Sequence, residues 1–389
     1  MQEKIKNIVV TSVFSLFLLT FAILCITCYF NPVAHSDSEN RDLAQFPAEI
    51  TWEGIVDKTV IEQFEDYSVD QFPFRELFRG VKAKFQYNVL GLKENNGYVE
   101  ENGYICQIKN EFNNQAINSS INTINKLYES QIAGKASNTY VSLIPDKNYY
   151  LGKDYGYPSP DYEMVAEMLK NAVSDGVYID IFDDLELESF YKTDTHWDQS
   201  KIHDVLEKLS STMGFETSGE YTENTIEGFE GIYYSQSAIN PPKDTLTYLT
   251  NDIISNLKVQ DVSNNKFLDV YALELFNEIF NAELDGYNVF LSGKAGHPML
   301  RIINPKATNN KTLVVFRDSY GSSLAPLIAE GYRTVYVVDL RSISYTTIGE
   351  KTMDNGARNP YYIDFTDKDV LFILSATVLE SGSIKITKD

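Results

Sequence analysis

The chain has 389 residues, of which 43% are hydrophobic and 23% charged, so it can bury a core and is long enough for one large domain with an extension. Its 55 acidic residues outnumber 33 basic ones, which gives a net charge of −22 at pH 7. This excess of negative charge argues against nucleic acid and against anionic lipid as binding partners.

An uncharged apolar run extends from Ile8 to Phe30, directly after Lys4 and Lys6. As a helix with a rise of ~1.5 Å per residue, this run spans roughly the ~30 Å hydrocarbon core of a bilayer. The lysines favour a cytoplasmic N-terminus, which places residues 31–389 outside as a single-pass membrane protein. A cleaved signal peptide is the alternative, but the run is long for one and no clear A-x-A cleavage site follows.

Cys106 is the one cysteine outside the apolar run, because Cys25 and Cys28 lie within it. The outer part therefore has no cysteine pair for a disulfide and no cysteine-based zinc site. An exported chain without disulfides is more typical of a bacterial surface than of a eukaryotic secretory route. We therefore expect the main domain on the outer side of a bacterial membrane.

Residues 31–90 are predicted to form a polar tether and a helical entry segment between the anchor (residues 1–30) and the main domain. Apolar residues with helical spacing occur at Val60, Ile61, Phe64, Tyr67 and Val69. Pro73 interrupts this helix, which resumes from Arg75. Further along, the Gly-Tyr pairs at 97–98 and 103–104 indicate a short hairpin, and residues 118–132 a helix.

From residue 139 onward, short apolar runs typical of strands alternate with helical patterns. The predicted strands are 139–144, 177–181, 312–316, 334–338 and 370–374, and the predicted helices are 163–173, 199–213 and 324–329. Strands separated by helices imply a parallel sheet covered on both faces. We therefore predict an α/β sandwich with about five parallel strands over residues 91–389. Residues 215–300 break the alternation and are predicted to be an insertion with loops and antiparallel structure.

Ser319 stands where the strand 312–316 ends and a helical pattern begins. The carboxyl ends of parallel strands form the functional crevice of such folds, and the free N–H groups of a helix N-terminus can hold a developing oxyanion. The position is that of a nucleophile elbow, although no G-x-S-x-G motif is present. The alternative is that Asp318 or Ser319 only caps the helix.

A serine nucleophile needs a base, and the histidines are His35, His196, His203 and His297. Asp194 precedes His196 by two residues, and a D-x-H segment can set a carboxylate against one imidazole nitrogen while leaving the other for a hydroxyl. On spacing alone, a buried histidine bonded to a loop carboxylate is equally open. A metal site built from His196, His203 and Asp194 matches no strong ligand pattern, so we expect neither metal nor cofactor.

Taken together, these segments resemble the DHHW family, within the SGNH-hydrolase-like group that includes alginate O-acetyltransferases. The resemblance covers roughly residues 40–375. It rests on the blocks NRDLAQFP, DQFPFRELF, IPDKNYY, TDTHWD, LDGYNVFLSGKAGHPML, VVFRDSYGSSLAPLIAEGY and VYVVDLRSI. The paired D-x-H-W and D-S-Y-G motifs are its more specific part. The resemblance implies a three-layer SGNH-hydrolase-like sandwich and acyl transfer.

In the family, the serine of the D-S-Y block is the nucleophile, and the D-x-H histidine and aspartate complete a triad. These positions map to Ser319, His196 and Asp194, and the Ser319 backbone N–H would contribute to the oxyanion hole. The residues that the resemblance places in support are Asp318, Trp197, Arg317, Lys147 and Arg341. Asp318 among them would shape the turn rather than take part in the chemistry.

Two positions depart from the family pattern. Thr195 occupies the second position of the D-H-H-W motif, of which the D-x-H pattern needs only the first and third. Arg317 stands where the wider G-D-S block has glycine, and an arginine there could crowd the turn or bind a substrate anion.

The implied function is that of a membrane-anchored extracellular O-acetyltransferase or acetylesterase acting on a cell-surface or exopolysaccharide. The acceptor, a sugar hydroxyl or water, decides between these two activities. The resemblance also implies a membrane-bound O-acyltransferase as the partner that supplies acetyl groups. One alternative is a non-catalytic glycan-binding or polysaccharide-assembly protein that retains the fold, and another is a metal-dependent hydrolase.

Overall fold

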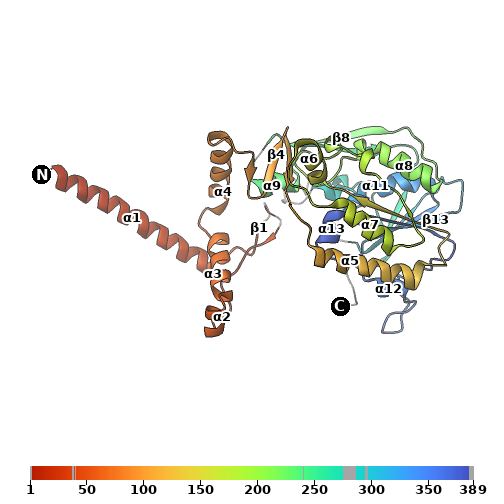
Figure 1. Cartoon of the computed structure of the whole chain (residues 1–389), viewed down its shortest axis with the longest axis horizontal. Coiled ribbons are helices and arrows are strands. Elements are labelled where there is room, and N and C mark those ends of the chain that lie inside the picture. Colours follow the sequence, from red (N-terminus) through yellow and green to blue (C-terminus); the bar gives the residue numbers. More distant parts are fainter. Residues whose placement is uncertain are drawn as a thin grey trace. The chain divides into compact units, whose positions relative to one another are not determined.

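The structure is a computed structural model that describes residues 2–36, 39, 41–239, 241–274, 286–293 and 297–384. The chain divides into two compact units (Figure 1). The first unit comprises Met1–Asn95 and Ser235–Asn240, and the second comprises Asn96–Tyr234 and Pro241–Asp389. Residues 284, 285 and 294–296 of the block LDGYNVFLSGKAGHPML lie outside the described residues.

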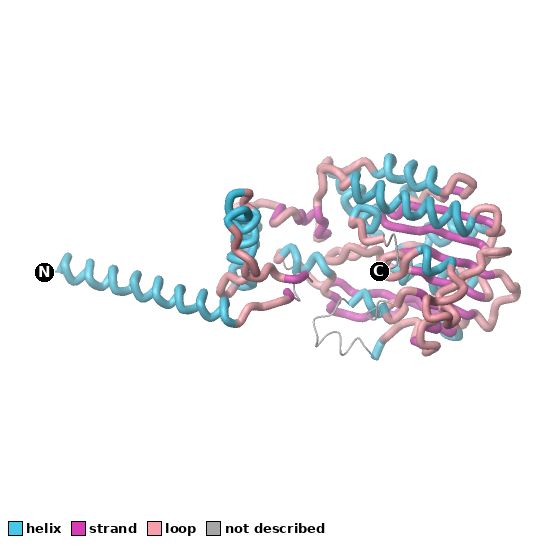
Figure 2. Tube along the Cα trace, turned by 90° about the horizontal axis from the view of Figure 1, so that it is seen from below, coloured by secondary structure: helices cyan, strands magenta, loops and turns pink. Residues whose placement is uncertain are grey.

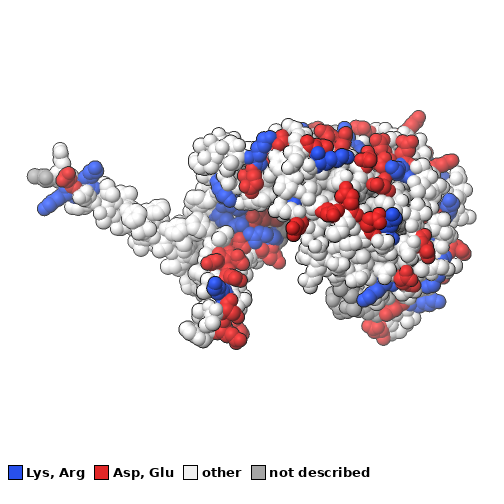
Figure 3. All heavy atoms as spheres, in the orientation of Figure 1, with Lys and Arg blue, Asp and Glu red and all other residues white. Residues whose placement is uncertain are grey.

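The first unit begins with the helix α1 (Gln2–Phe30), which is long and apolar enough to cross a membrane and contains no buried residue. Figure 3 shows α1 without charged side chains beyond its first turns. The short strands β1 (His35–Ser36) and β2 (Arg41–Asp42) then pair antiparallel.

The helices α2 (Trp52–Val56), α3 (Thr59–Asp70) and α4 (Arg75–Lys84) follow in the first unit, and α4 continues into a π-helical turn, η1 (Phe85–Val89). The predicted break at Pro73 is confirmed, because it lies between α3 and α4. Phe74 after it has a left-handed φ of 60°, which no continuous right-handed helix allows.

An eight-stranded sheet forms the core of the second unit, in the order β11-β10-β12-β14-β13-β15-β6-β7. Its parallel part consists of β14 (Thr334–Val338), β13 (Thr312–Arg317), β15 (Asp369–Ser375), β6 (Asn138–Ile144) and β7 (Val177–Tyr178). The antiparallel strands β12 (Met299–Ile303), β10 (Lys258–Asp261) and β11 (Phe267–Leu268) extend it. The prediction of about five parallel strands is confirmed.

Alternate side chains of each strand point to opposite faces of this sheet. Because the side chains on both faces are apolar, helices cover both faces. Leu313 and Val315 of β13 belong to one hydrophobic core, and Val314 and Phe316 belong to the other. The helices α6 (Lys147–Tyr155), α8 (His203–Met213) and α11 (Tyr320–Ile328) contribute to the first core. The helices α5 (Asn114–Leu127), α7 (Tyr162–Ala172), α12 (Tyr345–Gly349) and α13 (Ala376–Glu380) contribute to the second core. Figure 2 shows the strands side by side in this α/β sandwich.

Two hairpins complete the part of the second unit that concerns the site. The strands β4 (Tyr98–Glu101) and β5 (Tyr104–Gln107) form the hairpin predicted from the Gly-Tyr pairs. The strands β8 (Thr222–Phe229) and β9 (Asp244–Thr250) also pair antiparallel, as expected for residues 215–300. The short helix α9 (Ile232–Ser237) follows β8, and its residues 235–237 belong to the first unit.

Several helix boundaries differ from the predicted ones. The predicted helix 199–213 is divided into a 3-10 turn (Gln199–Lys201) and α8, which ends at Gly214 with φ 67°. The predicted helix 118–132 starts earlier, at Asn114, and ends in a π-helical turn (Tyr128–Ile132). The predicted helix 324–329 begins four residues earlier, at Tyr320, because the Asp318 carboxylate accepts a hydrogen bond from the Tyr320 N–H.

Candidate active site

The candidate site lies at the carboxyl edge of the parallel strands, the edge at which such folds bind ligands. Ser319 follows the end of β13, Asp339 follows β14, and Ser375 ends β15. Asp318 connects two of these strand ends, because its Oδ1 accepts from the Tyr320 N–H at 3.0 Å and its Oδ2 from the Ser375 N–H at 2.7 Å. The buried Asp318 carboxylate therefore fixes the turn that carries Ser319.

Ser319 does not cap the helix that follows it. It occupies the N-cap position of α11, but its side chain makes no capping hydrogen bond. Its Oγ lies instead 2.7 Å from Nε2 of His196. The backbone of Ser319 has φ −59° and ψ −30°, in the ordinary right-handed helical region, so the turn lacks the strain of a nucleophile elbow. Of the two capping candidates, Asp318 alone bonds the helix N-terminus.

His196 is held between Ser319 and Asp194. Its Nδ1 lies 2.5 Å from Asp194 Oδ1, and that oxygen also accepts from the His196 N–H at 2.9 Å. The other carboxylate oxygen, Oδ2, accepts from the Ile232 N–H at 2.9 Å. Because Asp194 can only accept when ionised, Nδ1 carries the proton and Nε2 is left to accept from the serine hydroxyl.

Asp194 is fully buried, yet its environment favours the ionised carboxylate. Burial alone would raise its pKa, but the charge of His196 and the hydrogen bonds from His196 and Ile232 lower the pKa below the ordinary value for an aspartate. The structure thus brings Ser319, His196 and Asp194 into one hydrogen-bonded chain.

The loop that carries Asp194 and His196 is closed at its base and held by a carboxylate. Phe190 and Trp197 form an isolated antiparallel bridge, which makes residues 190–197 a tight loop. Asp244, at the start of β9, accepts from the N–H and the hydroxyl of Thr193, both at 2.6 Å. The Thr193 hydroxyl in turn accepts from the Gly231 N–H at 3.0 Å.

Lys147 supports the same loop from the buried interior. Its Nζ donates to the carbonyl oxygens of Tyr191 and Lys192, at 3.0 and 3.2 Å, and lies 5.0 Å from the ring centroid of Tyr233. Burial lowers the pKa of Lys147 to about 8, against the attraction of nearby carboxylates that include Asp194. Lys147 is not among the residues that line the cavity at Ser319, and its Nζ contacts the loop backbone instead.

The lowered pKa of Lys147 predicts a change of stability with pH. Between about pH 8 and the ordinary lysine value of 10.5, the unfolded chain binds a proton that the folded chain has lost. The free energy of unfolding of the natural chain should therefore rise with pH relative to that of Lys147→Met, by on the order of 1 kcal/mol per pH unit. Urea unfolding of both proteins at pH 7 to 10 measures this difference, in which the titration of other groups cancels. A difference that stays flat over this range would contradict the lowered pKa.

Aromatic side chains fix the plane of the His196 ring. Tyr287 stacks on it with a centroid distance of 3.8 Å and an interplanar angle of 5°, and Tyr320 lies against it at 4.9 Å. The Tyr287 hydroxyl donates to Ser323 Oγ at 2.7 Å, and Nε1 of the fully buried Trp197 donates to the same oxygen at 2.8 Å. Trp197 and Tyr287 are therefore anchored to one point on α11.

A cavity of about 150 Å³ opens beside Ser319. Its lining combines apolar side chains with two arginines and a carboxylate. The lining residues are Tyr287, Asn288, Phe290, Leu291, Gly293, His297, Leu300, Arg317, Ser319, Ser322, Asp339, Arg341 and Ser342. At one side His297 Nδ1 lies 3.0 Å from Asp261 Oδ2.

Asp339 holds both arginines of this cavity. Arg341 contacts it through Nε at 2.9 Å and Nη2 at 2.6 Å, and Arg317 through Nη1 at 3.4 Å. Burial lowers the pKa of Arg317, and the negative charge of Asp339 acts in the opposite direction. Nε of Arg317 is buried without a hydrogen-bond partner among the described residues. Arg317 does not crowd the serine turn, because Gly321 leaves room for it: a Cβ on Gly321 would lie 2.5 Å from the Arg317 Cβ.

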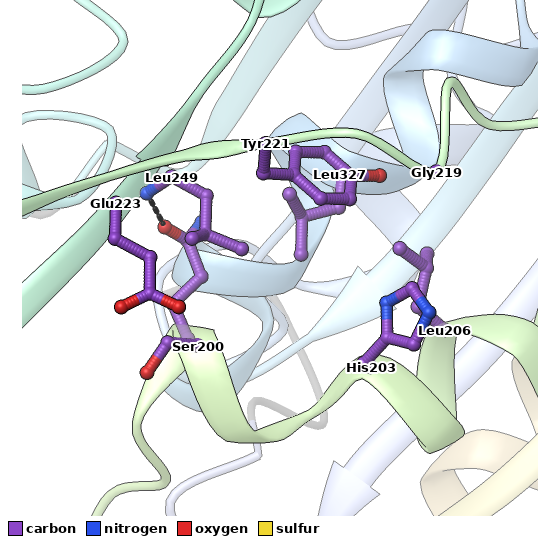
Figure 4. Close-up of a pocket in the computed structure, with 9 residues that line it drawn as sticks. Ser200, His203, Leu206, Gly219, Tyr221, Glu223, Leu249 and Leu327 are labelled. Atoms are coloured by element: carbon purple, nitrogen blue, oxygen red, sulfur yellow. Dashed lines mark hydrogen bonds between the residues drawn. The ribbon is translucent and has the colours of Figure 1, made fainter.

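His203 does not join the site. It is exposed on α8 and lines a separate cavity of about 260 Å³, together with Ser200, Tyr221 and Glu223 (Figure 4). Leu327, which also lines that cavity, is eight residues beyond Ser319 on α11, or about 12 Å at the rise of a helix. No three His, Cys, Asp or Glu side chains come together as metal ligands within the described ranges.

Sequence reasoning missed three residues that shape the site: Tyr287, Gly231 and Asp244. Tyr287 belongs to the block LDGYNVF, but nothing in its spacing indicates that it stacks on His196. Gly231 and Asp244 flank the helix α9, and only the folded chain brings them to the loop of residues 190–197.

Solved structures share this fold at low sequence identity. A DHHW family protein from Eubacterium siraeum matches with a TM-score of 0.55 and 19% identity, over 75% of this chain and 95% of that chain. Bacillus cereus PatB1, in a structure with a sulfonyl adduct, matches with a TM-score of 0.54 and 17% identity, over 76% and 100%. The O-acetyltransferase domain of Pseudomonas putida AlgJ matches more loosely, with a TM-score of 0.40 and 12% identity, over 75% and 94%. No protein-family model and no curated protein matches the chain. The expected α/β fold, shared with the DHHW family protein and with PatB1, is thus confirmed.

Proposed function

We propose that this protein is a membrane-anchored acyltransferase or ester hydrolase that works through an acyl-serine intermediate on Ser319. The observation that carries the proposal is the hydrogen-bonded chain from Ser319 Oγ through His196 to Asp194, with distances of 2.7 and 2.5 Å. The Ser319 hydroxyl lies against the unprotonated nitrogen of a buried imidazole whose other nitrogen is bound by a carboxylate. A nucleophile requires this arrangement, whereas a helix cap or a structural histidine does not.

In the first half of the reaction, the Ser319 oxygen attacks the carbonyl carbon of an ester donor while His196 Nε2 takes the hydroxyl proton. Asp194 stabilises the imidazolium that forms, because its carboxylate stays ionised against Nδ1–H. The oxyanion lies at the N-terminus of α11, where the Ser319 N–H is the donor we assign to it. Collapse of the tetrahedral intermediate returns the proton from Nε2 to the leaving alcohol and leaves an acyl ester on Ser319.

In the second half, an acceptor hydroxyl gives its proton to Nε2 and attacks the acyl ester, which releases the acylated acceptor and restores the Ser319 hydroxyl. A sugar hydroxyl as acceptor makes the protein an O-acyltransferase, and water makes it an esterase. The motif resemblance to O-acetyltransferases favours acetyl as the acyl group. The motif resemblance to alginate O-acetyltransferases points to a cell-surface or exopolysaccharide as acceptor.

The location and the partner that we propose rest on α1 as a membrane anchor. With Lys4 and Lys6 on the cytoplasmic side, α1 as an anchor places the second unit outside the cell. Donor acetyl groups must then reach the outer side of the membrane, a task suited to a membrane-bound O-acyltransferase. Lys147 and Trp197 hold the His196 loop, and Asp318 holds the serine turn. Arg317 and Arg341 line the cavity instead.

Covalent trapping tests this proposal. Because a PatB1 structure carries a sulfonyl adduct, an aryl sulfonyl fluoride is a suitable probe: the serine oxygen displaces fluoride and retains the sulfonyl group. The full chain in detergent should gain one sulfonyl group, located on Ser319 by peptide mapping, and Ser319→Ala and His196→Ala should gain none. Ser322→Ala, which removes a neighbouring hydroxyl of the cavity, is the matched control and should still be labelled. A chain that reacts no faster than its Ser319→Ala variant would favour the glycan-binding alternative.

A further inference from the structure

A stripe of large apolar side chains lies exposed along α4 and the turn η1. Its members follow one another at helical spacing, so they share one side of the helix. They are Phe74, Leu77, Phe78, Val81, Phe85 and Val89, and each is at least half exposed, from 51% for Phe78 and Phe85 to 67% for Val89. We call these six residues the apolar face of α4. A contiguous exposed surface of this kind marks a contact with a membrane or another molecule.

The opposite side of α4 is held by ion pairs within the first unit. Arg75 and Arg79 both contact Glu39 at 2.8 Å, and Arg75 also contacts Asp70 at 3.3 Å. Arg41 adds a second contact to Asp70, at 2.6 Å. All of these groups except Arg41 have side chains less than 15% exposed. The orientation of α4 is therefore fixed, and its apolar face is turned away from the part of the unit that binds it.

The same segment is tied to the end of α1. Gln71, between α3 and α4, exchanges two hydrogen bonds with the backbone of Val33, which lies three residues beyond α1: one from the Val33 N–H at 3.0 Å and one to the Val33 carbonyl at 2.8 Å. Phe72 then contacts Phe21 of α1, with ring centroids 5.3 Å apart, and contacts Phe78 of the apolar face at 5.6 Å.

These ring contacts join the apolar face to the anchor. Phe21 lies nine residues before the end of α1, or about 13 Å along the helix axis. If the apolar run of α1 occupies the hydrocarbon core, Phe21 is inside the bilayer. Phe72, whose ring contacts Phe21, then lies at the depth of the lipid headgroups or deeper. The apolar face of α4 is thus continuous with the lipid-facing surface of α1.

We propose that the apolar face of α4 is embedded in the outer leaflet of the membrane that α1 crosses. The occupant is lipid acyl chains. An amphipathic helix with aromatic and aliphatic residues on one side and Arg and Lys on the other is typical of a segment that lies in the interface. The net charge of −22 disfavours anionic headgroups as the source of attraction, so burial of apolar side chains provides it. The proposal rests on the anchor of the proposed function but not on the chemistry of Ser319.

Depth-dependent quenching tests the proposal on the full chain. The native cysteines Cys25, Cys28 and Cys106 are replaced by alanine, and single cysteines at Leu77→Cys or Val81→Cys are labelled with nitrobenzoxadiazole. The proteins are placed in phosphatidylcholine nanodiscs with or without doxyl-labelled lipid. We expect doxyl lipid to quench both labels at least twofold and aqueous iodide to have little effect.

Two further labels make the result interpretable. Glu76→Cys lies on the opposite side of the same helix and should respond to iodide rather than to doxyl lipid. Leu18→Cys lies in the middle of α1 and reports whether the anchor is inserted. Each labelled protein must keep the melting temperature of the cysteine-free chain, so that a misfolded variant is not read as a result.

The outcomes separate the possibilities. Lipid quenching at Leu77→Cys and Val81→Cys, with iodide quenching at Glu76→Cys, supports the proposal. Iodide quenching at Leu77→Cys and Val81→Cys equal to that at Glu76→Cys overturns it. Shielding of both labels from both quenchers, while Leu18→Cys is quenched by lipid, also overturns it and indicates a protein partner or a second copy on this face. If lipid does not quench the Leu18→Cys label, α1 is not inserted in the bilayer, and the proposal for α4 is wrong. That result would leave the proposed role of the triad unaffected.

Discussion

Asp194→Asn should lower kcat/KM for hydrolysis of an activated acetyl ester by about 10⁴-fold, the order of loss seen when a triad carboxylate is made neutral. The fully buried carboxylate accepts two hydrogen bonds from His196, one from the ring and one from the backbone. An amide in its place can donate to Nδ1, which favours the wrong tautomer and turns Nε2 into a donor that no longer accepts the Ser319 proton. Initial rates with 4-nitrophenyl acetate measure the effect.

A buried carboxylate elsewhere in the second unit provides the control. Asp369, at the start of β15, is 5% exposed and accepts from the Asn138 amide at 2.8 Å and the Tyr332 hydroxyl at 3.3 Å. It lies at the opposite end of its strand from Ser375, so Asp369→Asn should leave the rate within twofold. Equal losses in the two variants would mean that Asp194 supports folding rather than catalysis.

Gly231→Ala is the second substitution for which we expect a large effect. A Cβ at this position would lie 2.4 Å from the Cβ of Asp194 and 2.5 Å from its Cα and backbone nitrogen. Because the obstacle is backbone, no side-chain rotation relieves it, and the loop that carries Asp194 must move. Overpacking of this kind costs about 2 kcal/mol of stability. Displacement of a catalytic group by about 1 Å lowers kcat roughly 10²-fold. Thermal melting and ester hydrolysis measure the two effects.

The same change at Gly80 serves as its control. A Cβ there meets nothing within 4 Å, and Gly80 lies within α4, where alanine is the better helix former by about 1 kcal/mol. Gly80→Ala should therefore keep full activity. If Gly231→Ala has the melting temperature and the rate of the natural chain, the loop of residues 190–197 accommodates the added methyl group more easily than its contacts indicate.

The strands of the sheet could be predicted from sequence because each is a short apolar run between polar breaks. β14 has the predicted bounds 334–338, β13 and β6 differ from prediction by one residue at one end, and β15 differs by one residue at each end. β7 is shorter than predicted, although the Ile179 N–H still donates to Val141 O at 2.8 Å. The helix starts were less predictable, because side-chain caps such as that of Asp318 on Tyr320 determine them.

The position of Ser319 after a strand, the D-x-H spacing and the motif resemblance together indicate Ser319, His196 and Asp194, and the structure adds the distances between them. The residues that sequence reasoning missed act through tertiary contacts. Tyr287 stacks on a ring 91 positions away, and Asp244 holds Thr193 across 51 positions. Neither contact has a spacing or composition that a single sequence displays. The sequence shows that Arg317 replaces the glycine of the family pattern. Only the folded chain shows that Gly321 leaves room for the arginine side chain.

The position of β15 in the sheet bears on when this protein can acquire its fold. The strand pairs with both β13 and β6, and its partner residues Asp369 and Asn138 are 231 positions apart. The Asp318 carboxylate, which fixes the turn that carries Ser319, likewise accepts a hydrogen bond from the Ser375 N–H. If the chain is exported N-terminus first, as proposed, His196 and Ser319 have no ordered site around them until residue 375 has emerged. Truncation before that point should therefore yield no partly active product.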